Sequence, residues 1–294
     1  TQSRSSAASD VYKRQVNHLR DAEHGGYFWK TDLAGKPLSD RKMLYGNAFV
    51  VYAFVELHRA AGDRAPLERA RELYRDIQRH CHDPEHGGWG EHYTRDWRLI
   101  TAQDDRIEVE VAGLKSANAH LHWMEALAEL YEVTKDPEVG RSLAEAIRIN
   151  ATYFYPPDPG RSVFHRQPDW SEVTDPRSAG LSYGHNVEFA WLMIRAQEAL
   201  GVPPAWDHFH AVLRHARRFG WDAEQGGLYN RGFGDQPATD RDKVWWVQSE
   251  MMAALTDSLR HRASPEDEAA LLQLIAFLNA HQIHPETGVW LDTV

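Results

Sequence analysis

The chain has 294 residues, of which 42% are hydrophobic, and its 43 acidic side chains against 33 Lys and Arg give a formal net charge of −10. A chain of this length can bury a large core, and it contains no run of about 18 apolar residues that would predict a membrane span. The acidic balance argues against non-specific nucleic-acid binding, which requires a basic surface. The single cysteine, Cys81, excludes an internal disulfide and favours a reducing, cytoplasmic compartment.

The first residues, TQSRSSAASD, are small and polar and lack the apolar segment of a signal peptide. We interpret residues 1–15 as a non-native or disordered leader and residues 16–294 as one domain. The start at Thr1 and the abrupt end at Val294 predict that sequence is missing at both ends.

A loop signature recurs along the chain: an Asp or His, a few residues, then Gly-Gly and an aromatic residue. It occurs at residues 23–28, 83–89 and 222–229 and, in degenerate form, at 284–290. The Pro- and Gly-rich segment 155–164 occupies the slot between the second and third copies. The spacing is about 60 to 70 residues, a period that is typical of repeated supersecondary units.

Between these loops, apolar residues recur at spacings of three and four, which predicts a pair of helices in each interval. Gly or Pro falls where each first helix should end. The predicted pairs are 43–61 with 66–81, 116–134 with 138–153, 184–200 with 205–219, and 244–262 with 266–282. The Gly-Gly segments are expected to form short hairpins. No long strand pattern occurs, so the predicted fold class is all-α.

Helix hairpins of this period can stack as an open solenoid or close into a toroid, and the long repeat with its Gly-aromatic loops favours the closed α/α toroid. Such a toroid normally has six hairpins. We count about four complete hairpins and a remnant near residues 16–20, so about two hairpins are predicted to be missing from the ends of this sequence.

The first helix of each pair opens with polar and aromatic residues. The helix starts read LYGNAF from Leu44, KSANAHLHWMEAL from Lys115, YGHNVEFAWL from Tyr183 and KVWWVQSEMM from Lys243. Spacings of three or four place residue pairs on one helix face. These pairs are Asn118 with His122, His185 with Glu188, and Trp246 with Glu250. If these helices line the inside of the toroid, their stripes converge on one aromatic-walled pocket.

A histidine and a carboxylate at a helix start suit proton transfer near neutral pH. Packing gives no evident reason for polar groups there, since burying one without a partner costs about 1–3 kcal/mol. The alternative is that the histidines are structural and that Trp191, Trp245 and Trp246 belong to the core. Glu125 and Glu132 are expected to be ordinary acids on the helix surface.

A metal site is not predicted. His120 and His122 are two residues apart and therefore face different directions on a helix, which makes them a poor chelate. The sequence also lacks a CxxC pair, a phosphate-binding Gly-rich loop, a GxGxxG fingerprint and a GxSxG elbow.

The motifs YGNAF, N-x-H-L-H, YGHNVE and WWVQSE, in this order and spacing, resemble the N-acylglucosamine 2-epimerase superfamily and, within it, the cellobiose 2-epimerase branch. The resemblance runs from about His24 to Trp290. It implies an (α/α)6 barrel and reversible epimerisation at C2 of an aldose, without a redox cofactor or metal. The residues implied are His185 as general acid/base, Glu188 beside it, and the sugar-contacting residues Tyr45, Asn118, His122, Trp246 and Glu250.

The implied chemistry is consistent with these residue types. The C2 proton is acidic only when C1 is an aldehyde, so the sugar ring opens first. A base with a near-neutral pKa then removes the proton, and hydrogen-bond donors stabilise the enediolate. Glu188 would orient His185 and favour its charged form.

Two family features are absent from the sequence. Inversion needs a second histidine, which the family carries in a C-terminal segment, and the family has a substrate-binding arginine in an N-terminal hairpin. We therefore expect the parent gene to encode an active epimerase and the 294-residue polypeptide alone to be inactive. Rapid deuterium exchange at C2 by this polypeptide would contradict that expectation.

Three other functions compete. An aldose–ketose isomerase of the same superfamily needs only one base. A glycoside hydrolase of α/α-toroid type would need two carboxyl groups, which Glu188 and Glu250 could supply. A sugar-binding module without catalysis is the third. The sequence leaves open a monosaccharide or a disaccharide substrate, and a monomer or a homodimer.

Overall fold

The computed structural model describes residues 14–158, 162–175, 178 and 180–294, so residues 1–13 of the predicted leader lie outside the described residues. The chain divides into two compact units. The first unit runs to Ile149 and includes His165–Glu172, and the second comprises Asn150–Phe164 and Val173–Val294.

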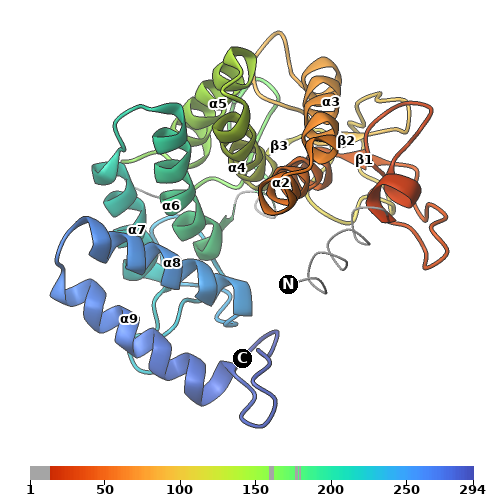
Figure 1. Cartoon of the computed structure of the whole chain (residues 1–294). Helices are drawn as coiled ribbons and strands as arrows, with labels where there is room; N and C mark the ends of the chain where they lie inside the picture. The colour runs from red at the N-terminus through yellow and green to blue at the C-terminus, as the bar shows by residue number, and fades with distance from the viewer. Residues whose placement is uncertain (1–13, 159–161, 176–177, 179) are drawn as a thin grey trace. The chain divides into compact units, whose positions relative to one another are not determined.

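The first unit consists of two helix hairpins. It contains a π-helical turn η1 (Gln15–Leu19), α2 (Leu44–Ala61), α3 (Arg64–His80), α4 (Ala117–Thr134) and α5 (Pro137–Ile149). Helix α2 packs against both α3 and α4, and α4 packs against α5 (Figure 1). Two antiparallel pairs of two-residue strands lie at the helix starts. They are β1 (Lys42–Met43) with β2 (His92–Tyr93), and β3 (Lys115–Ser116) with β4 (His165–Arg166).

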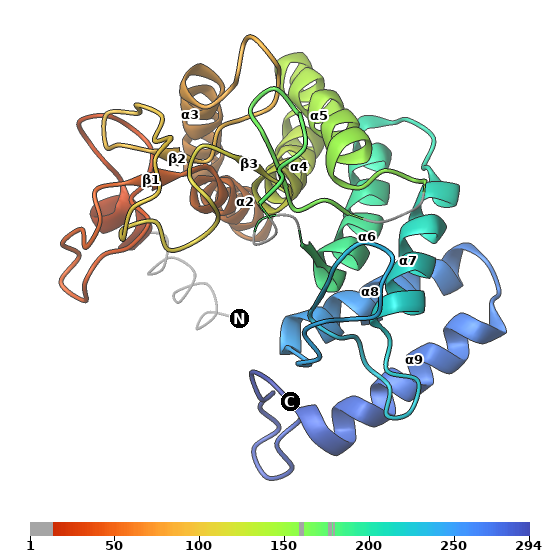
Figure 2. The same ribbon diagram turned by 180° about the vertical axis from the view of Figure 1, so that it is seen from behind.

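The second unit repeats this arrangement. It contains η2 (Asn150–Phe154), α6 (Tyr183–Leu200), α7 (Trp206–Gly220), α8 (Trp245–His261), α9 (Pro265–Phe277) and η3 (Leu278–Gln282). Helix α6 packs against α7 and α8, and α8 packs against α9 (Figure 2). Strand β5 (Leu181–Ser182) pairs antiparallel with β6 (Arg231–Gly232). The predicted helix pairs are thus confirmed, and strands are confined to short segments.

The helix ends have local causes. Gly62 and Gly201 end α2 and α6 in the left-handed conformation, and their amides bond back into the last helical turn. Asp63 and Ser264 cap α3 and α9 by accepting backbone N–H groups with their side chains. These residues are the breaks that the sequence predicted, because they satisfy backbone groups that a helix end leaves without intrahelical partners.

The Gly-Gly loops are short hairpins, as predicted. In the first loop the amide of Asp21 donates to the Gly26 carbonyl at 2.9 Å, and the Gly25 amide donates to the Asp21 carbonyl at 3.0 Å. Both glycines have positive φ, and a Cβ on Gly26 would lie 2.3 Å from the indole of Trp97. A side chain is therefore excluded by both backbone and packing. Single bridges close the hairpins at Arg20–Tyr27, His82–Trp89, Trp221–Leu228 and Ile283–Trp290.

A buried lysine holds each of the three regular Gly-Gly loops. Its position is two residues before the first helix of the hairpin. The ammonium–carboxylate pairs are Lys42–Asp21 at 3.1 Å, Lys115–Asp83 at 2.8 Å and Lys243–Asp222 at 2.7 Å. Burial alone would raise the pKa of Asp83, but the hydrogen bond from Lys115 holds that pKa at about 2. In the hairpin whose loop is 155–164, Leu181 takes the place of the lysine.

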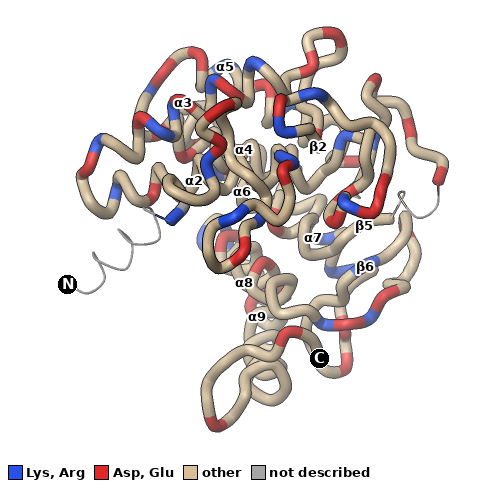
Figure 3. Tube along the Cα trace, turned by 90° about the vertical axis from the view of Figure 1, so that its right-hand side faces the viewer, with Lys and Arg blue, Asp and Glu red and all other residues tan. Residues whose placement is uncertain are grey.

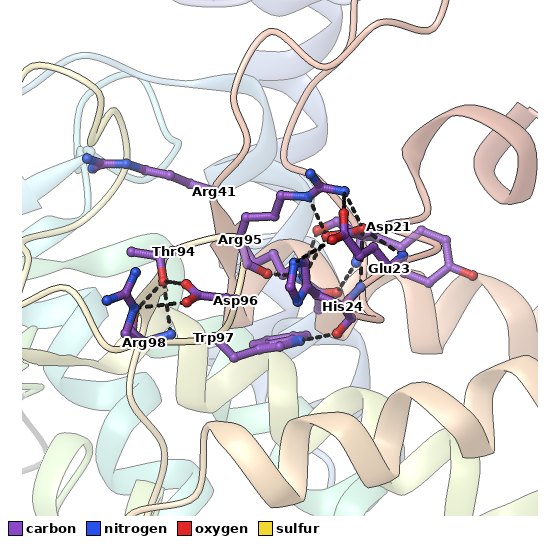
Figure 4. Close-up of polar contacts among 12 residues, drawn as sticks. Asp21, Glu23, His24, Arg41, Thr94, Arg95, Asp96, Trp97 and Arg98 are labelled. Carbon is purple, nitrogen blue, oxygen red and sulfur yellow. Dashed lines mark hydrogen bonds and ion pairs between the residues drawn. The ribbon is translucent and has the colours of Figure 1, made fainter.

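A tryptophan covers each of the first two loops. The indole N–H of Trp97 donates to the His24 carbonyl at 2.8 Å, and that of Trp170 donates to the His86 carbonyl at the same distance. Both tryptophans have left-handed backbones. Figure 4 shows Trp97 below the first loop, with Arg95 reaching the Asp21 carboxylate from the other side. These indoles are structural covers of the loops.

Positively and negatively charged residues are both scattered along each unit (Figure 3). Among the helices of the described segments, none combines the length and apolar character needed to cross a bilayer.

Candidate functional site

The residues that open α2, α4, α6 and α8 fall into two sets according to their position in the helix. The second and sixth residues of α2, α4, α6 and α8 lie on one face of each helix, and the fourth residue lies on a different face. The first set contains Tyr45 and Phe49, Asn118 and His122, Gly184 and Glu188, and Trp246 and Glu250. The second set contains Asn47, His120, Asn186 and Gln248.

The fourth helix residue clamps the Gly-Gly loop. Asn47 accepts the Tyr27 amide at 2.9 Å and donates to the Tyr27 carbonyl at 3.3 Å. Gln248 does the same with Leu228, at 2.8 and 2.7 Å. His120 accepts the Trp89 amide on Nε2 at 3.1 Å. The expectation that packing gives no reason for polar residues at the helix starts is therefore wrong for this position.

Asn186 is the exception. It occupies the clamp position of α6 and is fully buried, yet neither its amide oxygen nor its nitrogen has a hydrogen-bond partner among the described residues. The buried hydroxyl of Ser162, in the loop that replaces the Gly-Gly signature, also lacks a partner there. The hairpin that begins with YGHNVE thus differs from the other three in three ways. It lacks the Gly-Gly signature, it has Leu181 in place of the lysine, and the residue at its clamp position makes no clamp bond among the described residues.

In the first unit, His122 is held by an acid and two aromatic rings. Its Nδ1 lies 2.9 Å from Glu125 Oε2, and its ring centroid lies 5.3 Å from that of Tyr45 and 4.7 Å from that of Phe49. Glu125 is only 16% exposed, so the prediction of an ordinary surface acid is wrong, because this carboxylate orients the imidazole. Glu132 is 57% exposed and pairs with Arg59 at the surface, as predicted.

Asn118 lies one turn before His122 and is also buried. Its side-chain amide donates to Glu110 Oε1 at 2.8 Å, and Glu110 Oε2 lies 2.9 Å from Nε2 of His165. Sequence reasoning missed Glu110 and His165. Neither belongs to a helix or to a periodic pattern, so the sequence carried no signal for them.

A second buried carboxyl group, that of Glu91, belongs to the same unit. Glu91 accepts the Ser116 hydroxyl at 3.1 Å and the Tyr45 amide at 3.4 Å, and it is 2% exposed. Burial, together with the nearby charge of Glu110, raises its pKa to about 8. Burial also lowers the pKa of the neighbouring His92 to about 4.

Tyr45 also borders an aromatic pocket of the first unit. The pocket has a volume of about 340 Å³, and Phe28, Trp29 and Phe49 contribute to its walls. Planar rings around a concave space are the surfaces on which the apolar faces of sugar rings and other small molecules can pack.

In the second unit, His185 lies at the start of α6 between two aromatic rings. Its ring centroid lies 4.8 Å from that of Trp246 and 5.3 Å from that of Phe164. The Ser182 side chain caps the helix by accepting the His185 amide at 3.4 Å. A Cβ on Gly184 would lie 2.5 Å from the Trp246 ring, so the glycine of the YGH motif allows this indole to approach the histidine.

Glu188 follows His185 by one helical turn and is 8% exposed. Glu250 accepts the indole N–H of Trp191 at 2.8 Å. Trp191 therefore has a polar partner as well as packing contacts, a role that the core interpretation did not include. Trp245 is 45% exposed, which contradicts its assignment to the core.

The structure thus groups the predicted site residues within each unit. Tyr45 contacts His122 in the first unit, with Asn118 one turn away on the same helix. His185 contacts Trp246 in the second unit, with Glu188 one turn away. The second group can hold an imidazole against an indole face beside a carboxylate, an arrangement suited to moving a proton on a bound ligand.

Comparison with known proteins gives consistent matches. The N-acylglucosamine 2-epimerase (GlcNAc 2-epimerase) family matches residues 4–294. A cellobiose 2-epimerase from Bacteroides fragilis is 29% identical over 94% of this chain and 69% of its own. The structure of a cellobiose 2-epimerase from Spirochaeta thermophila is 32% identical, with a TM-score of 0.86, covering 98% of this chain and 71% of that one. A D-mannose isomerase from Thermobifida fusca is 29% identical over 80% of this chain and 58% of its own.

These matches confirm the resemblance inferred from the four motifs, the all-α fold of the (α/α)6 toroid class, and the prediction of an isomerase or epimerase acting on sugars. The chain spans between 58% and 69% of the length of the curated relatives named above.

Proposed function

The chain belongs to the N-acylglucosamine 2-epimerase family, and from that premise we propose that the protein inverts C2 of an aldose. A disaccharide of the cellobiose or mannobiose type is the favoured substrate, because relatives that are 32% identical to this chain are named cellobiose 2-epimerases. The observation that carries the proposal is the His185 ring held against Trp246, with Glu188 one helical turn away.

His185 acts as the base. After the sugar ring opens, the imidazole removes the proton from C2, and the electron pair left behind delocalises onto the C1 carbonyl to give an enediolate. Return of the proton by His185 to the same face regenerates the substrate, and delivery of a proton to the opposite face, which needs a second proton donor there, gives the epimer. Trp246 supplies an apolar surface for the sugar next to the reacting carbon.

Glu188 and Glu250 have different tasks. Glu188 shares a helix face with His185, and as a carboxylate it favours the imidazolium that forms when the proton is taken up. Glu250 is fixed by the indole N–H of Trp191 and contacts sugar hydroxyls. In the first unit, the residues that the sequence predicted as sugar contacts are Tyr45, Asn118 and His122.

Aldose–ketose isomerisation is the second candidate, favoured by the match to a D-mannose isomerase. In that reaction one base carries the proton from C2 to C1 through the same enediolate. The same residues serve both reactions, so only the product distinguishes them.

Product analysis tests the proposal. The full-length protein, meaning the product of the parent gene, is incubated with cellobiose, and the sugars are identified by NMR. We expect the C2 epimer, in which mannose replaces the reducing glucose. A ketose product would establish isomerisation instead, and free glucose would establish hydrolysis. Binding of cellobiose without any chemical change would indicate a sugar-binding module without catalysis.

We further propose a cytoplasmic location, because a single, buried cysteine suits a reducing compartment. We also propose that the protein acts as a monomer or a homodimer. Cell fractionation and light scattering on the purified protein test the two points. Recovery from a secreted fraction would contradict the first, and a larger assembly would contradict the second.

A further inference from the structure

Glu110 lies in the segment between β2 and β3, and its backbone is left-handed, with φ of 64°. This conformation costs a residue with a Cβ about 1–2 kcal/mol. Strained residues of this kind persist where the surrounding structure fixes them, and they cluster at functional sites. The strain here directs a carboxylate into the interior of the first unit.

Both carboxylate oxygens of Glu110 are engaged there. Oε1 accepts from Asn118 Nδ2 at 2.8 Å, and Oε2 lies 2.9 Å from His165 Nε2. The side chain of Glu110 is 5% exposed and that of His165 is 7% exposed. A buried carboxylate held on both oxygens is a strong anchor, since hydrogen bonds to a charged partner are stronger than those between neutral groups.

The hydrogen bond between Asn118 and Glu110 determines which way the Asn118 side-chain amide points. A carboxylate can only accept hydrogen bonds, so the nitrogen of Asn118 must face Glu110 and the carbonyl oxygen must face the opposite side. Without such a partner the two ends of an amide are nearly interchangeable. Asn118 shares a helix face with His122, the face that carries the predicted sugar contacts.

We propose that Glu110 is a positioning residue that fixes the Asn118 amide so that its oxygen accepts a hydrogen bond from a sugar hydroxyl. The inference rests on the proposed function for its ligand class. In this account Glu110 acts through Asn118 and not through a contact of its own with the sugar.

Two substitutions separate positioning from folding. Glu110→Gly removes the carboxylate and relieves the left-handed backbone, and this relief offsets part of the stability lost with the two buried hydrogen bonds. Glu110→Gln keeps a carbonyl oxygen that can accept from Asn118 when its amino group faces Nε2 of His165, and in that arrangement it preserves the orientation of the Asn118 amide. We expect Glu110→Gly to raise KM about tenfold, the loss of one oriented hydrogen bond, with little change in kcat. Glu110→Gln should stay close to the wild type.

A double-mutant cycle tests whether Glu110 acts through Asn118. Steady-state kinetics on cellobiose are measured for the full-length wild type, Glu110→Gly, Asn118→Ala and the double variant. If the proposal is right, Glu110→Gly has little further effect once Asn118 is alanine. The same loss in both backgrounds would overturn it, as would a fall in melting temperature that accounts for the lost activity.

A second measurement keeps this inference separate from the proposed function. The side-chain amide protons of Asn118, assigned by their absence in Asn118→Ala, are followed by NMR without sugar. We expect a hydrogen-bonded, slowly exchanging signal in the wild type and in Glu110→Gln, and loss of protection in Glu110→Gly. An unchanged signal in Glu110→Gly would refute the anchor. A wild type that leaves cellobiose unchanged would refute only the proposed activity.

Discussion

His120 tests directly how the Gly-Gly loops are held. Its imidazole is buried, and Nε2 accepts the Trp89 amide, so the ring must stay neutral on that nitrogen for the clamp to form. Burial lowers its pKa to about 3. Gln248 makes the equivalent clamp with an amide that does not titrate. The variant His120→Gln therefore places at the clamp position of α4 the residue type that already clamps the loop at α8.

The pH dependence has a definite sign. The folded pKa of His120 lies below the unfolded value of 6.5, so the unfolded chain takes up a proton first as the pH falls. The stability contribution is complete above pH 6.5 and is lost as the pH falls toward 3. Between pH 8 and pH 5 the loss from this group is about 2 kcal/mol, a value set mainly by the unfolded pKa.

Urea unfolding at pH 8 and pH 5, followed by tryptophan fluorescence, measures this loss. Between these pH values, wild type should lose about 2 kcal/mol more stability than His120→Gln. Other titrating groups, including His92 and Glu91, are present in both proteins and cancel in the comparison. The exposed His281→Gln serves as the control and should behave as the wild type. Equal pH dependence in wild type and His120→Gln would refute the clamp reasoning.

Three further predictions concern neighbouring groups. Asn47→Ala should cost about 2–4 kcal/mol in urea unfolding because buried loop groups lose their partners, whereas Asn186→Ala, which breaks no such bond among the described residues, should cost clearly less; equal losses would contradict this. Glu91→Gln should change the pH dependence of stability between pH 5 and 8. As the pH rises, the wild type should lose up to about 1.4 kcal/mol per unit relative to Glu91→Gln, because the folded pKa of about 8 lies above the unfolded 4.5, and the same pH dependence in both proteins would count against it. Trp191→Phe removes the donor to Glu250 and should weaken cellobiose binding about tenfold in calorimetry with the melting temperature retained; unchanged affinity would refute that role.

Much of the fold was predictable because its signals are local. Apolar spacing defines each helix, and residues such as Gly62 and Ser264 end or begin helices through contacts within a few positions. The Gly-Gly loops were visible as a repeat. The ion pairs that hold these loops were not predicted, because the repeat alone does not show that the recurring lysine, such as Lys42, reaches the loop aspartate, such as Asp21.

The candidate site was predictable only in part for the same reason. Helix spacing placed Asn118 with His122, but it gave no way to distinguish the loop clamp His120 from its neighbour. That distinction depends on where the Trp89 amide lies in space. Glu110 escaped detection because it lies in a segment without helix or strand, and its importance comes from contacts with residues distant in sequence.

Exchange at C2 tests the central role of His185 most directly. Full-length protein is incubated with cellobiose in D₂O, and deuterium at C2 of the reducing sugar is followed by NMR for wild type, His185→Ala and the exposed control His281→Ala. We expect exchange in the wild type and the control, and a rate lowered by about a hundredfold or more in His185→Ala, the range contributed by general-base catalysis. Exchange by His185→Ala at the wild-type rate would show that another group removes the proton.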